Sequence, residues 1–326
     1  MPQRFFGWIF LLGGLVSLVA CSGPIVPRGP EQLYRLAGEQ INNENYVRAL
    51  DTLARIARNS PDSRYGAKAS LTRLALLAGL ARSALTLGEL YLEVREEVEA
   101  AAYRSELHTA AMNQFGLGQS WALALVEALD QQLPTLADKP FLMDPLLPTT
   151  PAPEHPALAR LREGEPIPEP ERRAIERAAG RRALAEVMAA LAGAPGDFGR
   201  AYDALAQGNA RLEPAAVFLA FGNELVSLGG LFGKKALNNP RYQRLFYERA
   251  LALAERALAA TTSPDSPRAQ QAERLKRHCQ EVLGVARAPR SQAYLFPHAA
   301  SKFPVSQYEE PPRWTVSVWR RSTQCP

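Results

Sequence analysis

Cysteine and histidine are the side chains best suited to nucleophilic or metal chemistry, and both are scarce in this sequence. The chain has 326 residues, with three cysteines and four histidines. Cys21, Cys279 and Cys325 form no Cys-x-x-Cys pair, and no His-Glu-x-x-His pattern places two imidazoles on one helix face. His278 adjoins Cys279, but this pairing is more typical of a helix surface than of a metal site. We therefore expect no metal ligand set.

Motifs for hydrolysis and nucleotide binding are also missing from the sequence. Residues 118–122, Gly-Gln-Ser-Trp-Ala, lack the last glycine of a Gly-x-Ser-x-Gly nucleophile elbow, and no glycine-rich phosphate loop occurs. Carboxylates alternate with arginines along the predicted helices, which is typical of a solvated face with i,i+4 ion pairs. The sequence therefore predicts that the protein is not an enzyme, has no catalytic residue and binds no cofactor.

Cys21 differs from the other cysteines because of the segment that precedes it. Residues 1–20 have the layout of an export signal: Arg4, an apolar stretch over residues 5–12, and then small residues. The three residues directly before the cysteine are Leu18, Val19 and Ala20. This pattern resembles the lipobox of bacterial lipoproteins. A plain signal peptide with a chance cysteine, or an N-terminal membrane anchor, is the alternative.

The lipobox resemblance implies an attachment point and a location. Cys21 would be the first residue of the mature chain and would carry a covalent lipid, with further acylation such as palmitate, because several acyl chains together anchor a protein durably. Ser22, rather than Asp, follows the cysteine, which in that family implies the outer membrane, on its periplasmic side. Residues 21–30 contain three prolines and two glycines and predict a short tether.

Residues 31–133 have the periodicity of helices. Two antiparallel helices are expected around a polar turn at residues 42–45, and Pro61 ends the second. The large, small and helix-ending positions resemble those of a tetratricopeptide (TPR) repeat: Leu33, Leu36, Ala37, Tyr46, Ala49, Leu53 and Pro61. A second, weaker repeat is expected, with Gly79 as its turn residue and Ala84 lying 35 residues after Ala49.

Residues 134–170 break the helical pattern. Ten prolines fall in this stretch, so we expect no long helix there. The stretch is either an inter-domain linker or a loop that wraps the helices. Five large apolar side chains favour partial packing over free disorder: Phe141, Leu142, Met143, Leu146 and Leu147.

Residues 171–284 return to a helical pattern. Residues 218–230, FLAFGNELVSLGG, resemble the first helix of a TPR, in which Gly222 and Asn223 are packing and turn residues. The partner helix is expected in residues 246–264, after an insertion over residues 230–244 that the standard repeat lacks, and a helix over residues 269–283 caps the array. The predicted fold is all-α: TPR-like antiparallel hairpins (α-solenoid-like), with a Pro-rich interruption and an irregular C-terminal tail.

The tail, residues 285–326, is basic and aromatic. It holds six of the chain's lysines and arginines against two glutamates, while the whole chain has a formal net charge of +5. The body is therefore balanced, and we expect no nucleic-acid binding, which requires a broad basic face. Four tail residues are candidate partner contacts: Trp314, Trp319, Arg320 and Arg321. The alternative is a tail packed on its own domain.

The two remaining cysteines pose a separate question. In an oxidising compartment, Cys279 and Cys325 would form a disulfide that pins the tail to the last helix. The alternative is a buried free thiol at Cys279 and a loose one at Cys325, because the sequence does not set the distance between them.

The sequence favours a binding protein over an enzyme. The leading hypothesis is a lipid-anchored helical scaffold that binds other envelope proteins, as an accessory subunit of an envelope transport, export or assembly system. The alternatives are an envelope enzyme acting on peptidoglycan or lipid, and a small-ligand-binding lipoprotein of a transporter. A cleft that gathers Asn223, Glu224 and Lys234 would favour the enzyme, whereas an apolar cavity between helices would favour the ligand binder.

Overall fold

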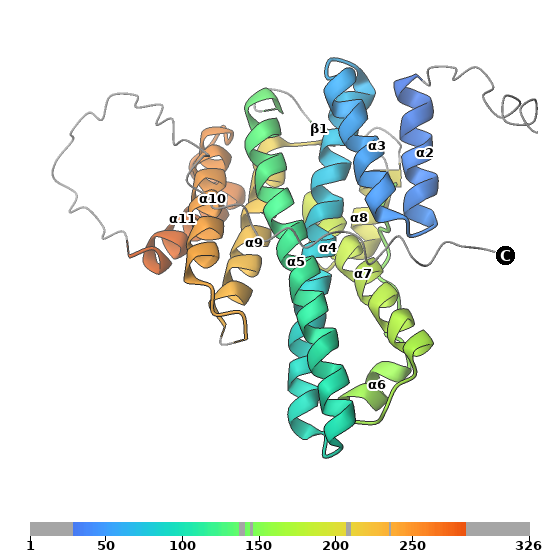
Figure 1. The fold of residues 1–326 in the computed structure, drawn as a ribbon. Helices are drawn as coiled ribbons and strands as arrows, with labels where there is room; N and C mark the ends of the chain where they lie inside the picture. The colour runs from blue at the N-terminus through green and yellow to red at the C-terminus, as the bar shows by residue number, and fades with distance from the viewer. Residues whose placement is uncertain (1–28, 137–140, 144–145, 207–209, 235, 285–326) are drawn as a thin grey trace, which may run out of the picture. The chain divides into compact units, whose positions relative to one another are not determined.

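Helices make up most of the chain in the computed structural model, which describes residues 29–136, 141–143, 146–206, 210–234 and 236–284 (Figure 1). This agrees with the predicted all-α class. The helices are α2 (Pro30–Asn42), α3 (Tyr46–Asn59), α4 (Arg64–Glu97), α5 (Ala101–Leu136), α6 (Ala157–Arg162), α7 (Glu169–Leu191), α8 (Phe198–Ala206), α9 (Pro214–Gly233), α10 (Pro240–Ala259) and α11 (Pro267–Val282).

Short local signals in the sequence set where several helices begin and end. Proline occupies the start of α2, α9, α10 and α11, where its missing N–H costs no hydrogen bond. The Ser63 hydroxyl accepts a hydrogen bond from the Gly66 N–H at 3.0 Å, and Ser266 caps α11 in the same way through the Ala269 N–H at 3.1 Å. Helix α3 ends at Asn59, just before Pro61, as predicted.

Helix α4 is the central element of the core. It packs against α3, α5, α7 and α9, so that the helices before and after the Pro-rich stretch contact the same element. The prediction of a turn at Gly79 is wrong, because Gly79 lies in the middle of α4. A Cβ there would lie 2.5 Å from Leu184 Cδ2, so the glycine permits the close approach of α4 and α7. Glycine marks a helix crossing here instead of a turn.

Among the helices that the structure describes, two are long and apolar enough to cross a membrane by length and composition. They are α4 and α9, with mean hydropathies of 1.2 and 1.6 over their most apolar windows. Within the protein, 72% and 67% of these windows are buried. Helices that are apolar on all sides are expected in the interior of a globular unit, and burial against neighbouring helices accounts for their composition.

The Pro-rich stretch is partly packed on the helices. Helix α5 runs through Pro134 and is followed by strand β1 (Phe141–Met143), which pairs antiparallel with β2 (Ala210–Leu212). Met143 and Leu147 are buried, which confirms the predicted packing of these two residues. The six-residue α6 is the only helix that lies wholly within the described part of residues 134–170.

Helices α9, α10 and α11 pack as a group. Gly222 of α9 lies where a Cβ would be 2.7 Å from Leu275 Cδ2 of α11, so its predicted packing role is confirmed. Ala250 and Ala257 of α10 are fully buried. Asn223 was predicted as a turn residue, but it lies inside α9 and is exposed. The insertion lengthens α9 to Gly233 and starts α10 at Pro240, leaving a short connection between the two helices.

Candidate functional site

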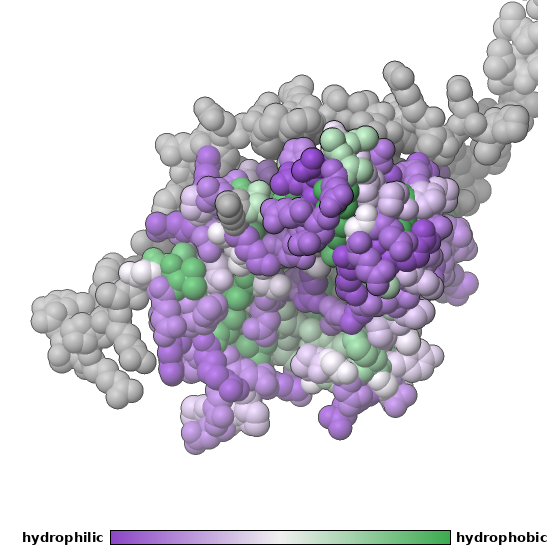
Figure 2. Space-filling view, turned by 90° about the horizontal axis from the view of Figure 1, so that it is seen from below, coloured by the Kyte–Doolittle hydropathy of each residue, from purple (hydrophilic) through white to green (hydrophobic). Residues whose placement is uncertain are grey.

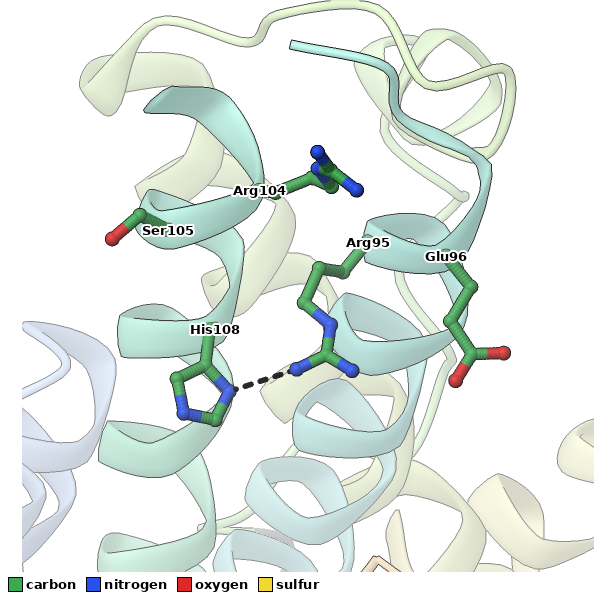
Figure 3. A pocket seen from close by; sticks show the side chains of 5 residues that line it. All are labelled: Arg95, Glu96, Arg104, Ser105 and His108. Carbon is green, nitrogen blue, oxygen red and sulfur yellow. Dashed lines mark hydrogen bonds between the residues drawn. The ribbon is translucent and has the colours of Figure 1, made fainter. Parts of the chain in front are cut away.

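A surface hollow of about 440 Å³ lies where α4 ends and α5 begins. It is lined by Arg95, Glu96, Arg104, Ser105 and His108 (Figure 3). Arg95 Nη1 donates to His108 Nδ1 at 3.1 Å, while Glu96 and Ser105 point away from this pair (Figure 3). No carboxylate in this set orients the imidazole and no hydroxyl faces it, so these five residues form a polar surface without a catalytic arrangement.

A buried ion cluster joins three helices far apart in the sequence. Arg82 of α4 donates from Nε to Glu224 Oε1 of α9 at 2.9 Å, and its Nη2 contacts the second oxygen of the same carboxylate. Its Nη1 donates to Glu186 Oε2 of α7 at 2.8 Å. The Glu224 side chain is 4% exposed and that of Arg82 is 25% exposed. The guanidinium therefore binds two carboxylates, one of them through both oxygens.

Electrostatics at this cluster are governed by burial and by mutual attraction. Burial raises the pKa of the Glu224 carboxyl, although the charge and hydrogen bonds of Arg82 act in the opposite direction. Burial also acts to lower the pKa of the Arg82 guanidinium, but the two carboxylates outweigh it, so that this pKa is raised. The Glu224 oxygens are already occupied by Arg82, so the cluster fixes α4, α7 and α9 relative to one another instead of offering a base to a substrate.

A second cavity lies between α5, α9 and α10, and we call it the α5–α10 cavity. Its volume is about 110 Å³. Its lining comprises Leu129 and Asp130 of α5, Leu225 of α9, and Arg249, Ala252, Leu253 and Arg256 of α10. The α10 residues recur at helical spacing and share one face of that helix. Helix α5 packs mainly on α4, and α10 mainly on α9 and α11, so the cavity lies where these two groups meet.

The charged groups of the α5–α10 cavity are unevenly paired. Arg249 Nη2 lies 2.8 Å from Asp130 Oδ2, and these two side chains are 44% and 45% exposed. Burial raises the pKa of the Asp130 carboxyl, with Arg249 and then Arg256 opposing the shift. By contrast, Nη1 of Arg256 is buried and has no hydrogen-bond partner within the described ranges. One guanidinium donor in the cavity lining is thus unused.

Tyr91 and Glu176 form another buried polar contact. The Tyr91 hydroxyl of α4 donates to Glu176 Oε1 of α7 at 3.2 Å, and the Tyr91 side chain is fully buried. Burial is the main cause that raises the pKa of both groups. A hydrogen bond from Gln114 of α5 also reaches the carboxyl. This contact ties α4, α5 and α7 together and opens onto none of the cavities described above.

His155, His278 and Cys279 make contacts that account for their positions within the fold. His155 Nδ1 accepts from the Ala157 N–H at 3.2 Å near the start of α6, and the His278 ring packs edge-on against Tyr247 with centroids 5.8 Å apart. Cys279 is fully buried, and burial raises the pKa of its thiol to about 11. Among the described residues, no group of three or more His, Cys, Asp or Glu side chains is arranged to hold a metal ion.

The residues proposed to mark an enzyme site do not converge. Glu224 binds Arg82 inside the protein, whereas Asn223 is exposed on α9. Lys234 Nζ donates to Glu89 Oε2 at 2.9 Å, at the far end of α9. Within the described structure, no cleft brings these three side chains together. The arrangement that would favour an enzyme is therefore not found among the described residues.

Several predicted site residues lie outside the described residues. They are Leu18, Val19, Ala20, Cys21, Trp314, Trp319, Arg320, Arg321 and Cys325. The lipid attachment, the tail contacts and the disulfide between Cys279 and Cys325 therefore stay predictions. The Arg82 cluster and the α5–α10 cavity, in contrast, were not predicted, because each gathers residues from three helices that are separated in the sequence.

Comparison of this chain with protein-family models, curated proteins and solved structures gives no match.

Proposed function

We propose that this protein is a lipid-anchored scaffold on the periplasmic side of a bacterial outer membrane, where it binds other envelope proteins without catalysing a reaction. The observation that carries the proposal is the sequence Leu18-Val19-Ala20-Cys21 after an export-type signal. Lipid on Cys21 holds the chain at the membrane, and the tether over residues 21–30 leads into α2, which begins at Pro30.

The arrangement of helices supports a TPR-like binding scaffold. Helix α11 packs on both α9 and α10, and α4 packs on both α2 and α3, as the next helix does in a TPR array. Small residues lie at the close contacts of the C-terminal group, among them Gly222 and Ala250. Helices α5, α6, α7 and α8 lie between these two groups in the sequence, so the proposed array is interrupted instead of continuous.

The hydrophobic areas on the surface are small, which suits the binding of a partner protein through a few contacts. On the face drawn in Figure 2, hydrophilic residues predominate and hydrophobic ones show in separate areas instead of one broad patch. Among the described residues, the exposed large apolar side chains are Val47, Met112, Tyr202 and Val282. The tail residues Trp314, Trp319, Arg320 and Arg321 remain the proposed partner contacts.

Site-specific photo-crosslinking in intact cells of a Gram-negative host tests this proposal. A photoreactive residue is placed at exposed Met112, at exposed Tyr202, at Trp314 in the tail, and at buried Leu125 as the matched control. We expect discrete crosslinked products from at least one of the first three positions and none from Leu125. We also expect their loss in a Cys21→Ala variant, which lacks the anchor. Absence of discrete products at all three positions, or products that survive Cys21→Ala, would contradict the proposal.

A further inference from the structure

We infer that the outward face of helix α5 binds the same face of a second copy of this chain, with the two helices antiparallel. The inference goes beyond the scaffold proposal and does not depend on the lipid anchor. It rests on an open helix face, on its lack of charge and on its symmetry. We call this surface the α5 face, and its residues are Ser105, Thr109, Met112, Gly116, Ser120, Leu123 and Glu127.

Helix α5 is covered mainly from one side. It is 36 residues long, and within the described structure α4 is the one element with which it packs extensively (Figure 1). Six of the seven residues of the α5 face are exposed, and Leu123 is half-buried. Met112 is 42% exposed, and no atom lies within 4 Å of the place that a Cβ at Gly116 would take. The α5 face is therefore accessible to a partner.

The α5 face lacks the charges that a helix surface in water usually carries. Residues 109–126 contain no charged side chain, which corresponds to about 27 Å of helix at 1.5 Å per residue. By contrast, the surface of α7 carries ion pairs such as Arg173 with Glu169. The hydroxyls of Thr109 and Ser120 donate to carbonyls of their own helix at 3.0 and 2.9 Å. They can therefore enter an interface without losing a hydrogen bond.

The α5 face is symmetrical about Gly116. Its other residues lie four, seven and eleven positions away on both sides. In an antiparallel pair that crosses at Gly116, Met112 faces Ser120 of the second copy, and Leu123 faces its Thr109. Each large side chain then meets a smaller one, which suits close packing between helices. A parallel pair would place Met112 against Met112, so the antiparallel pair packs better.

The N-terminal end of the α5 face is flanked by cations. Arg104 and His108 line the hollow drawn in Figure 3. Of the carboxylates near this end, Glu106 lies 3.9 Å from Arg172 of α7, and Glu96 points away from His108 (Figure 3). Arg104 has no ion pair with a described residue. An acidic group of a second copy can supply the missing counter-charge.

The C-terminal end of the α5 face carries that acidic group. Glu127 is exposed, accepts a hydrogen bond from Gln131 at 3.0 Å and has no ion pair with a described residue. Antiparallel pairing brings Glu127 of one copy level with Ser105 of the other, within one turn of Arg104 and His108. The two-fold axis repeats this contact at the other end. A parallel pair would instead bring like charges together, so the charges select the antiparallel direction.

Crosslinking between introduced cysteines tests the pairing. The parent is the full chain with Cys21→Ala and Cys325→Ser, in which the remaining thiol, at Cys279, is buried. A short bis-maleimide is added to intact cells, and products of twice the mass of the chain are scored on gels. We expect Gly116→Cys to crosslink with itself, and the parent to give no such product. These self-crosslinks have a known mass and are counted apart from the crosslinks to other proteins considered above.

A second pair of cysteines tests the direction. We expect Ser105→Cys to crosslink with Glu127→Cys when the two variants are expressed together. Ser105→Cys alone is the matched control and should give no dimer, because an antiparallel pair separates the two copies of residue 105 by 22 positions, or about 33 Å of helix. Self-crosslinking of Ser105→Cys would mean a parallel pair and would overturn the inference.

Other occupants of the α5 face give different results with Gly116→Cys. A crosslink only to a different protein would assign the face to a partner. A monomer in which this cysteine reacts with maleimide only after residues 285–326 are removed would assign the face to the tail. Either result, or the absence of a self-crosslink, would show that the inference is wrong.

Sedimentation equilibrium of the purified full chain measures the strength of the dimer. Met112→Glu should raise its dissociation constant about tenfold or more, because apolar burial is lost and an unpaired carboxylate enters the interface. Val47→Glu is the matched control, since Val47 is 46% exposed but lies on α3, and it should leave the dimer unchanged. Circular dichroism confirms that both variants are folded. A parent chain that is monomeric at every concentration, or equal effects of the two variants, would overturn the inference.

Discussion

The buried pair formed by Arg82 of α4 and Glu224 of α9 is one of the contacts that hold α9 in place, and breaking this pair from either side should have unequal effects. Arg82→Met leaves the Glu224 carboxyl, which is 4% exposed, without a cation. Removing one partner of a buried ion pair costs about 3–5 kcal/mol of unfolding free energy. We expect Arg82→Met to lower the unfolding free energy by an amount in that range. Solvent barely reaches the Glu224 carboxyl, so water cannot replace the stabilisation that Arg82 provides.

Glu224→Leu should cost less. Arg82 is 25% exposed and keeps Glu186 at 2.8 Å, so water and the second carboxylate compensate part of the loss. Glu224→Leu loses charged hydrogen bonds but gains this compensation, so we expect it to lower the unfolding free energy by about 1–3 kcal/mol. The double variant, Arg82→Met with Glu224→Leu, places two apolar side chains in contact and should lie within about 1 kcal/mol of the parent.

Urea titrations of the chain over residues 22–326, followed by far-ultraviolet circular dichroism, measure these values from the transition midpoints and slopes. Glu186→Gln is the matched control, because Glu186 is 36% exposed and its contact with Arg82 should contribute less than about 1 kcal/mol. The reasoning is refuted if Glu224→Leu destabilises more than Arg82→Met. It is also refuted if the double variant is as unstable as the sum of the two single ones, since the two residues would then not interact.

Three further predictions follow from buried groups. Burial raises the pKa of Glu176, so the folded state binds its proton more tightly than the unfolded state, and the unfolding free energy falls as pH rises from the ordinary carboxyl pKa through the raised one. Glu176→Gln should flatten this pH dependence in urea titrations, and an unaltered profile would contradict the assignment. Cys279 is buried and its thiol has a pKa of about 11, so it should not react with Ellman's reagent at pH 8 in a folded Cys325→Ser chain that lacks Cys21. The same thiol should react fully in guanidinium chloride. Rapid reaction of the folded chain would show that the thiol is accessible. Gly79→Ala should lower the unfolding free energy by about 1–3 kcal/mol, because the added Cβ would clash with Leu184. Gly116→Ala should raise it by up to about 1 kcal/mol, because no atom lies within 4 Å of the added Cβ and alanine favours the helix. Equal effects of the two substitutions would refute the packing argument.

Local patterns predicted the elements well, because they depend on residues near in sequence. Pro61 follows the end of α3, as predicted, and the helix predicted over residues 269–283 corresponds to α11, which begins two residues earlier at Pro267. Gly79 shows the limit of this approach. In the sequence, a glycine within an apolar stretch can mark either a turn or a close crossing of two helices. For Gly79, only the position of Leu184 in the folded chain distinguishes these two cases.

The ion cluster did leave a signal in the sequence. Arg82 is the only charged residue between Arg73 and Glu89, and Glu224 is the only one within α9. A single charge in an apolar helix requires a partner of opposite sign, so these two could have been paired from the sequence alone. The α5–α10 cavity left no such signal. Asp130, Arg249 and Arg256 resemble ordinary surface charges until α5 and α10 are placed face to face.

The central claim is that Cys21 is the first residue of the mature protein and carries its lipid. Mass spectrometry of the full chain, purified from membranes of a Gram-negative host after expression with its own signal, tests this directly. We expect residues 1–20 to be absent and the N-terminal peptide to begin at Cys21 with a diacylglyceryl thioether and an amide-linked acyl chain. A Cys325→Ser control should carry the same lipid, and Cys21→Ala should carry none. An uncleaved N-terminus, or a mature chain with an unmodified Cys21, would contradict the account.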